Sequence, residues 1–203
     1  MSFIRKHSCK LAVLALCAAM GIYLLFTYVW KPAEPLPIVQ AAPSFEMTDI
    51  DGNTVSLDST NGKVRLVYFY FANCPDVCPP TTYLLGEAQE KLREEGSLGK
   101  DVELISITFD PERDTPEVIR EFAINMEVEF DGWHFLRGEE EATIQLARDF
   151  EVAVVKDEKN NTFIHSNAIM LLDQDGQIRM WMNGSDLEVV TPEYIVKQVN
   201  RLL

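Results

Sequence analysis

Two cysteines, Cys74 and Cys78, are the residues of this sequence best suited to chemistry, because only Pro75, Asp76 and Val77 separate them. If the second half of the segment is helical, this spacing places both sulfurs on one side, with Cα atoms about 6 Å apart. The separation allows a disulfide, and two thiolates so placed can bind one soft cation such as Cu(I). The spacing therefore predicts a thiol pair whose redox state controls metal binding.

Two simpler interpretations of the pair stay open. A purely structural disulfide is one, although its five-residue loop would constrain the unfolded chain little. A zinc site is the other, although zinc needs four protein ligands, or three with a water. Because the pair precedes a predicted helix, the N–H groups of the first helical turn favour ionisation of at least one thiol.

His165 is the candidate for a third donor. It follows a polar loop at 156–162 and precedes a strand, so we expect it beside the sheet end that holds the cysteines. A neutral imidazole added to two thiolates gives a donor set that Cu(II) also tolerates. The domain's other histidine, His134, is given the ordinary role of a satisfied surface or core residue.

Other polar and sulfur-containing residues near these positions are given supporting roles. Asp76 is a candidate charge just outside the ligand sphere. Asp110 and Asp114 are expected to hold the neighbouring loop through hydrogen bonds to backbone N–H groups. Three methionines at alternating positions of predicted strands are assigned to core packing: Met170, Met180 and Met182.

A βαβ unit is predicted to position the cysteines. The almost uninterrupted β-branched and aromatic run at 64–71 is typical of a central strand buried on both faces. Apolar spacing predicts a helix over 83–95, a second strand follows at 102–108, and Thr-Pro-Glu begins a helix at 115–126. The cysteines then lie where the central strand ends, which is where open parallel sheets place ligand chemistry.

The remaining elements complete the predicted fold. They are an opening hairpin at 45–57, a helix at 139–150, an apolar stretch at 152–155 before the polar loop, a hairpin at 167–172 and 177–182, and a closing helix from 191. This order predicts an α/β class with a thioredoxin-like fold, in which helices flank a central mixed sheet.

The N-terminal segment 11–30 contains twenty residues without a charge, which is long enough to cross a membrane as a helix. Arg5, Lys6 and Lys10 precede it, so the positive-inside rule predicts a cytoplasmic tail at 1–10. A Pro-rich stalk at 31–42 and an extracytoplasmic domain at 43–203 follow. A cleaved signal, or a lipoprotein signal ending at Cys17, is the alternative.

Charge restricts the partners of this outer domain. The chain after residue 31 has 14 basic and 32 acidic residues, a net charge of −18 that repels nucleic acid and attracts cations and basic protein surfaces. Cys74 and Cys78 are its only thiols, and an extracytoplasmic compartment is oxidising, so the pair must be a disulfide, a metal site or both in turn.

Three separated motifs resemble the Sco family of copper chaperones: YFYFANCPDVCPPTT at 68–82, DPERDTPE at 110–117 and FIH at 163–165. The resemblance implies that Cys74, Cys78 and His165 bind one copper, as Cu(I) or Cu(II), per chain. It implies a metallochaperone, rather than an enzyme, for the dinuclear copper site of cytochrome c oxidase. The implied partners are the copper-bearing oxidase subunit and another copper chaperone or a thiol reductase.

Two functions of other classes compete. One is a membrane-anchored thiol-disulfide oxidoreductase or peroxiredoxin-like antioxidant that works without metal. Three residues rather than two separate the cysteines, and 160–169 lacks a proline, which argues against a thioredoxin-type reductase. The other is a copper or redox sensor, for which the tail is too short to hold a signalling module. The short N-terminus favours a bacterial inner membrane over a mitochondrion.

Overall fold

The computed structural model of the protein describes residues 2–29 and 35–203. Helix α1 (Ser2–Leu24) continues into the π-helical turn η1 (Leu25–Val29). Within it, Lys10–Thr27 has a mean hydropathy of 2.0 and is long enough to cross a membrane, a property that anchors share with N-terminal signals. Residue 30 of the predicted anchor and residues 31–34 of the predicted stalk lie outside the described residues.

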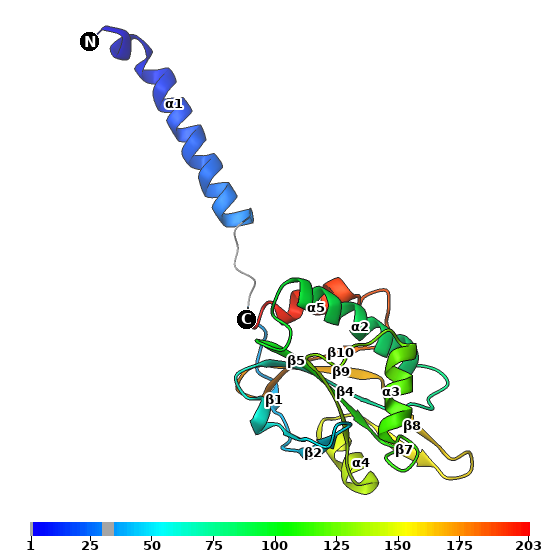
Figure 1. The fold of residues 1–203 in the computed structure, drawn as a ribbon. Helices are drawn as coiled ribbons and strands as arrows, with labels where there is room; N and C mark the ends of the chain where they lie inside the picture. Colours follow the sequence, from blue (N-terminus) through cyan, green and yellow to red (C-terminus); the bar gives the residue numbers. More distant parts are fainter. Residues whose placement is uncertain (1, 30–34) are drawn as a thin grey trace. The chain divides into compact units, whose positions relative to one another are not determined.

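The second compact unit, Pro35–Leu203, contains a mixed eight-stranded sheet in the order β1-β10-β9-β4-β5-β6-β2-β3 (Figure 1). Its central strand β4 (Val64–Tyr70) is buried at every residue, as the sequence predicts. On one side β4 pairs in parallel with β5 (Val102–Thr108), and on the other side it pairs antiparallel with β9 (Ala168–Leu172). A strand with neighbours on both sides gives the site a rigid base.

Helices flank this sheet, as predicted. In Figure 1, α2 (Cys78–Glu94) and α5 (Pro192–Val199) lie together above it and α4 (Glu140–Asp149) lies below. The hydroxyl of Thr115 caps α3 (Pro116–Asn125) by accepting from the N–H of Val118. A short 3₁₀ turn, η2 (Asp58–Thr60), precedes β4.

Several strands differ from the predicted set. Strand β6 (Trp133–Arg137), which extends the parallel sheet beside β5, was not predicted. The predicted polar loop at 156–162 is wrong, because β7 (Val154–Asp157) and β8 (Thr162–His165) form a separate antiparallel pair. His165 therefore ends a strand instead of following a loop.

The two predicted hairpins are confirmed in the main sheet. They are β2 (Glu46–Asp49) with β3 (Thr54–Ser56), and β9 with β10 (Gln177–Asn183). Strand β1 (Gln40–Ala41) also pairs with β10, and Leu36 is buried. The packed chain thus begins earlier than residue 43, because residues assigned to a stalk supply an edge strand.

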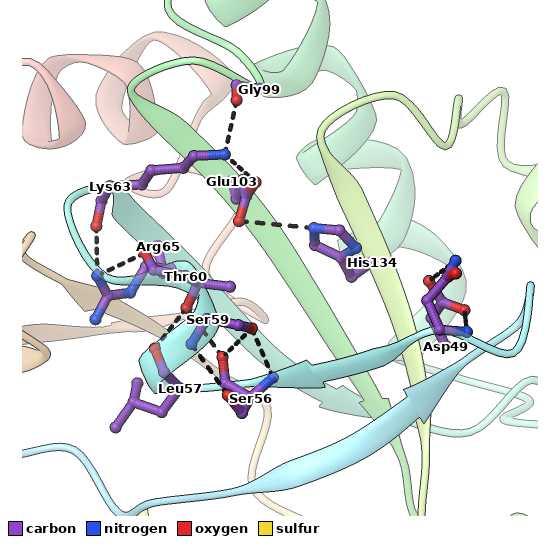
Figure 2. A network of polar contacts seen from close by, with 11 residues as sticks. Asp49, Ser56, Leu57, Ser59, Thr60, Lys63, Arg65, Gly99, Glu103 and His134 are labelled. Atoms are coloured by element: carbon purple, nitrogen blue, oxygen red, sulfur yellow. Dashed lines mark hydrogen bonds and ion pairs between the residues drawn. The ribbon is translucent and has the colours of Figure 1, made fainter.

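A polar network closes the amino end of the parallel strands, opposite the end where the cysteines lie. Figure 2 shows Glu103 of β5 between the Lys63 ammonium and the His134 ring, whose Nε2 lies 3.6 Å from the carboxylate. Burial raises the pKa of Glu103, but hydrogen bonds and positive charge from His134 and Lys63 outweigh it and hold that pKa below its usual range. His134 thus takes the structural role predicted for it.

Replacing Glu103 with Gln is expected to lower the free energy of unfolding by about 1–3 kcal/mol at pH 7, because charge-assisted hydrogen bonds of a buried carboxylate are lost. Because the pKa of Glu103 is lower in the folded than in the unfolded protein, its ionised carboxylate stabilises the fold at pH values above the unfolded-state pKa. This stabilisation is lost as the pH falls through the folded-state pKa. Urea unfolding at pH 7 and near pH 3 measures the difference, which should vanish in acid. Exposed Glu121→Gln is the control, and a loss that does not change with pH would contradict the account.

Candidate metal centre

Cys74 and Cys78 lie on the chain segment that joins β4 to α2. Cys74 belongs to the turn after the strand, with its N–H donating to the carbonyl of Phe71, while Cys78 is the first residue of the helix. The prediction for the sulfur positions required the second half of the segment to be helical. Cys78 is helical, whereas Cys74 lies in the turn before the helix. Both residues are buried, with 8% of Cys74 and 0% of Cys78 exposed.

His165 reaches the same place from the end of β8. Its Nε2 lies 3.6 Å from the sulfur of Cys78, and one donor atom from each of Cys74, Cys78 and His165 lies within 4.8 Å of the other two. The ring's Nδ1 lies 3.0 Å from the carbonyl of Ser166, to which it donates. This bond leaves the Nε2 lone pair directed at the sulfurs, an arrangement typical of a metal-binding histidine.

An aromatic cluster holds the imidazole in place. The ring of His165 lies with its centroid 5.1 Å from that of Phe109 and 6.0 Å from that of Phe71. Phe163, two residues before the histidine, packs against both phenylalanines. These contacts join β8 to the ends of β4 and β5, so folding of the apolar core brings the late histidine to the cysteines.

Polar contacts fix the surrounding loops. The carboxylate of buried Asp114 accepts from the N–H of Ala72, 3.0 Å away, as predicted, and from the hydroxyl of Thr108. Asp110 instead pairs with Arg113, whose guanidinium donates to the carbonyl of Asn161 in the β7–β8 turn, 2.8 Å away. The acidic motif therefore holds the cysteine loop directly and the histidine hairpin through Arg113.

A second tie joins the two halves of the site. Asn167, two residues after His165, donates to the hydroxyl of Thr81 over 2.8 Å, and Thr81 lies on α2 three residues after Cys78. Thr81 in turn donates to the carbonyl of Gly184. A Cβ at Gly184 would lie 2.9 Å from Thr81 and 3.0 Å from Asn167, so only glycine fits there. Nothing in the sequence pattern singled out this tie.

The other candidate residues take structural positions. The Asp76 side chain is exposed, and it is the residue's backbone N–H that contacts the Cys74 sulfur. The packing role predicted for the methionines is confirmed, because two are buried in the core and the third packs against it: Met170, Met182 and Met180.

The pKa values of the two thiols shift in opposite directions. A hydrogen bond from Cys78 lowers the pKa of Cys74 to about 4, against burial, with further help from backbone N–H groups. The pKa of Cys78 is raised, because its proton is shared with Cys74 and because it is buried beside that negative charge. The reduced pair therefore holds one thiolate and one thiol at neutral pH.

This asymmetry predicts the pH dependence of alkylation. Between pH 6 and pH 8 the reduced protein should react with iodoacetamide at Cys74 at a nearly constant rate, since the thiolate is already formed above pH 4 to 5. Mass spectrometry of a chain with Cys9 and Cys17 replaced by Ser measures the rate. Cys78→Ala removes the hydrogen bond and should restore a steep pH dependence. A rate that rises about tenfold per pH unit in the parent chain would contradict the assignment.

Known proteins resemble this chain in sequence and fold. The family model for SCO1/SenC matches residues 36–203. The SCO1 protein homolog of Bacillus subtilis is 35% identical over 150 residues, which cover 73% of this chain and 76% of the homolog. The solved structure of BsSco is 34% identical, covers 82% of this chain and 94% of BsSco, and has a TM-score of 0.68. BsSco is described as a member of the Sco family of cytochrome c oxidase assembly proteins with a disulfide switch.

Copper has been observed in one of these relatives. The structure of Bradyrhizobium japonicum ScoI with copper bound is 28% identical, covers 80% of this chain and 99% of ScoI, and has a TM-score of 0.65. These likenesses confirm the predicted thioredoxin-like fold, and the sequence, the site geometry and the family model agree. The chain belongs to the SCO1/SenC family.

Proposed function

We propose that the protein binds one copper ion through Cys74, Cys78 and His165 and serves assembly of the dinuclear copper site of cytochrome c oxidase. One observation carries the proposal: donor atoms from residues 74, 78 and 165 lie within 4.8 Å of one another in a buried setting. Copper is the cargo of such a protein, so the site must release the ion as well as hold it.

The donor chemistry suits copper. Two sulfurs select soft cations, and the imidazole nitrogen extends the set to Cu(II). The thiolate of Cys74 is formed at neutral pH, whereas Cys78 must lose its proton when the ion binds, so binding releases protons. The hydrogen bond from Nδ1 of His165 to Ser166 keeps Nε2 available to the ion.

The relatives support copper as the ion and oxidase assembly as the purpose. ScoI was solved with copper, and BsSco combines oxidase assembly with a disulfide switch. In this chain, oxidation of the pair to a disulfide would remove both sulfur donors, so thiol redox state and copper occupancy are coupled. A thiol-disulfide oxidoreductase without metal is not favoured, because that chemistry does not need the nitrogen of His165 at the sulfurs.

The copper-bearing oxidase subunit is the proposed recipient, and another copper chaperone or a thiol reductase is the proposed donor of copper or electrons. We assign the domain to the outer side of a bacterial cytoplasmic membrane. The apolar helix, the three basic residues before it and the acidic domain after it support a single-pass anchor at 11–30 with residues 1–10 in the cytoplasm.

A deletion strain of the source organism tests this function. Expression of the full chain should restore the copper content and activity of cytochrome c oxidase, whereas a Cys74→Ser chain at equal abundance should not. Restoration by Cys74→Ser would contradict the proposal. Oxidase with normal copper in the deletion strain, at limiting copper, would contradict the assembly role.

A further inference from the structure

An apolar hollow begins at the residue after Cys78. It has a volume of about 410 Å³ and lies between the start of α2, the end of α3 and the loop before α5. Tyr83 and Leu187 stand on its rim with 44% and 49% of their surface exposed. Its other apolar lining residues are Pro79, Pro80, Leu84, Met126 and Pro192. Large apolar side chains exposed around a hollow mark an interaction site.

A second hollow of about 240 Å³ adjoins the first, and the two share Tyr83, Glu87 and Met126. Its charged lining consists of four carboxylates and one guanidinium: Glu87, Glu90, Glu127, Glu129 and Arg93. The guanidinium is already paired with Glu90 and Glu129. Glu87 and Glu127 therefore give this hollow a negative potential next to the apolar one.

Glu127, which lines the second hollow, has an unfavourable backbone conformation. Its φ of 58° lies in the left-handed region, just after the end of α3, where glycine is the ordinary residue. A glutamate in this conformation costs about 1 kcal/mol relative to glycine. The chain thus holds a carboxylate at the hollow at the expense of local stability.

We propose that the two hollows form one docking groove for a partner polypeptide that presents an apolar side chain beside lysine or arginine. The inference rests on the proposed function, and it names the chemistry of the partner that meets the copper site. An apolar side chain would fill the first hollow, and the neighbouring cation would face Glu87 and Glu127. Because the groove begins at Pro79, a partner held there has its own metal or thiol ligands close to Cys78.

The negative charge of the groove favours a basic partner polypeptide over a second copy of the chain. The chain after residue 31 carries a net charge of −18, so another copy would bring its own carboxylates to an acidic groove. A basic segment gains from the same field, which speeds encounter and weakens with salt. The groove is therefore suited to transient contact with a basic protein surface.

Three labelled peptides of equal length test the groove: a tryptophan flanked by lysines, the same peptide with serine for tryptophan, and one with glutamates for lysines. Fluorescence anisotropy is read on the metal-free full chain in phosphatidylcholine nanodiscs, with empty nanodiscs as the blank. The first peptide should bind at least about tenfold more tightly than the other two, and added salt should weaken it.

Variants locate the binding. Glu87→Lys and Tyr83→Ser should each weaken the first peptide about fivefold or more, whereas Glu141→Lys on α4, with the same change of charge, should leave it within about twofold. Equal binding of all three peptides, or equal weakening by Glu141→Lys, would overturn the proposal. Copper per chain is measured separately, after each variant has been loaded with copper: loss of peptide selectivity with normal copper rejects the groove alone, and lack of copper in the loaded parent chain rejects the proposed function.

Discussion

Replacing Cys78 with Ser is expected to abolish stoichiometric copper binding. The serine hydroxyl does not ionise at neutral pH, so only the sulfur of Cys74 would remain, and one thiolate cannot select a soft cation against a competing chelator. Loss of residues that merely orient a metal ligand costs 10- to 100-fold in affinity, and loss of a ligand should exceed about 100-fold. Copper per chain after competition with a Cu(I) chelator measures the effect.

The control for this variant is Cys17→Ser, which changes the same residue type on the exposed apolar helix and should keep one copper per chain. Circular dichroism checks that the Cys78 variant stays folded, since serine is close in size to cysteine at this fully buried position. One tightly bound copper per chain in the folded Cys78→Ser variant would show that Cys74 and Cys78 do not bind the ion together.

Replacing His165 with Ala is expected to weaken Cu(II) binding about 100-fold and Cu(I) binding much less. Two thiolates satisfy Cu(I), whereas Cu(II) depends on the added nitrogen. The variant should therefore lose its sulfur-to-Cu(II) charge-transfer absorption and change its paramagnetic resonance spectrum. His134→Ala, which alters the histidine beside Glu103, should leave both spectra unchanged.

Titration of the two histidine variants with Cu(I) and Cu(II) separates the outcomes. A Cu(II) affinity in His165→Ala equal to that of the parent chain would show that the imidazole does not bind the ion. Equal losses in His165→Ala and His134→Ala would indicate a general effect on folding instead. The Cu(I) titration checks that the dithiol is intact in each variant.

The sequence was sufficient for the parts of the site that depend on local patterns. The run at 64–71 is β-branched and aromatic apart from two residues, which indicates a buried strand. Thr115 and Thr191 are capping residues whose positions fix helix starts. The cysteine pair at the end of that strand followed from these elements. The prediction that His165 lies beside it depended on the fold, and the 3.6 Å contact with Cys78 confirms it.

The parts that were missed depend on tertiary contacts. Strand β6 is short and mixes a histidine and an arginine with apolar residues, so its pattern is ambiguous until β5 supplies a partner. The polar residues at 156–162 concealed the β7–β8 hairpin. Its inward side chains Val154 and Phe163 are buried, while Val155 and Ile164 on the other face are exposed. The hydrogen bond between Asn167 and Thr81 joins residues 86 positions apart, beyond any local pattern.

X-ray absorption at the copper edge of the loaded full chain identifies the atoms bound to the ion. Two sulfur neighbours and one imidazole nitrogen are expected around the ion in the parent chain. At excess copper, His165→Ala should lose the nitrogen contribution and Cys74→Ser should lose one sulfur. A first coordination sphere without sulfur, or one that stays the same in both variants, would contradict copper binding by these residues.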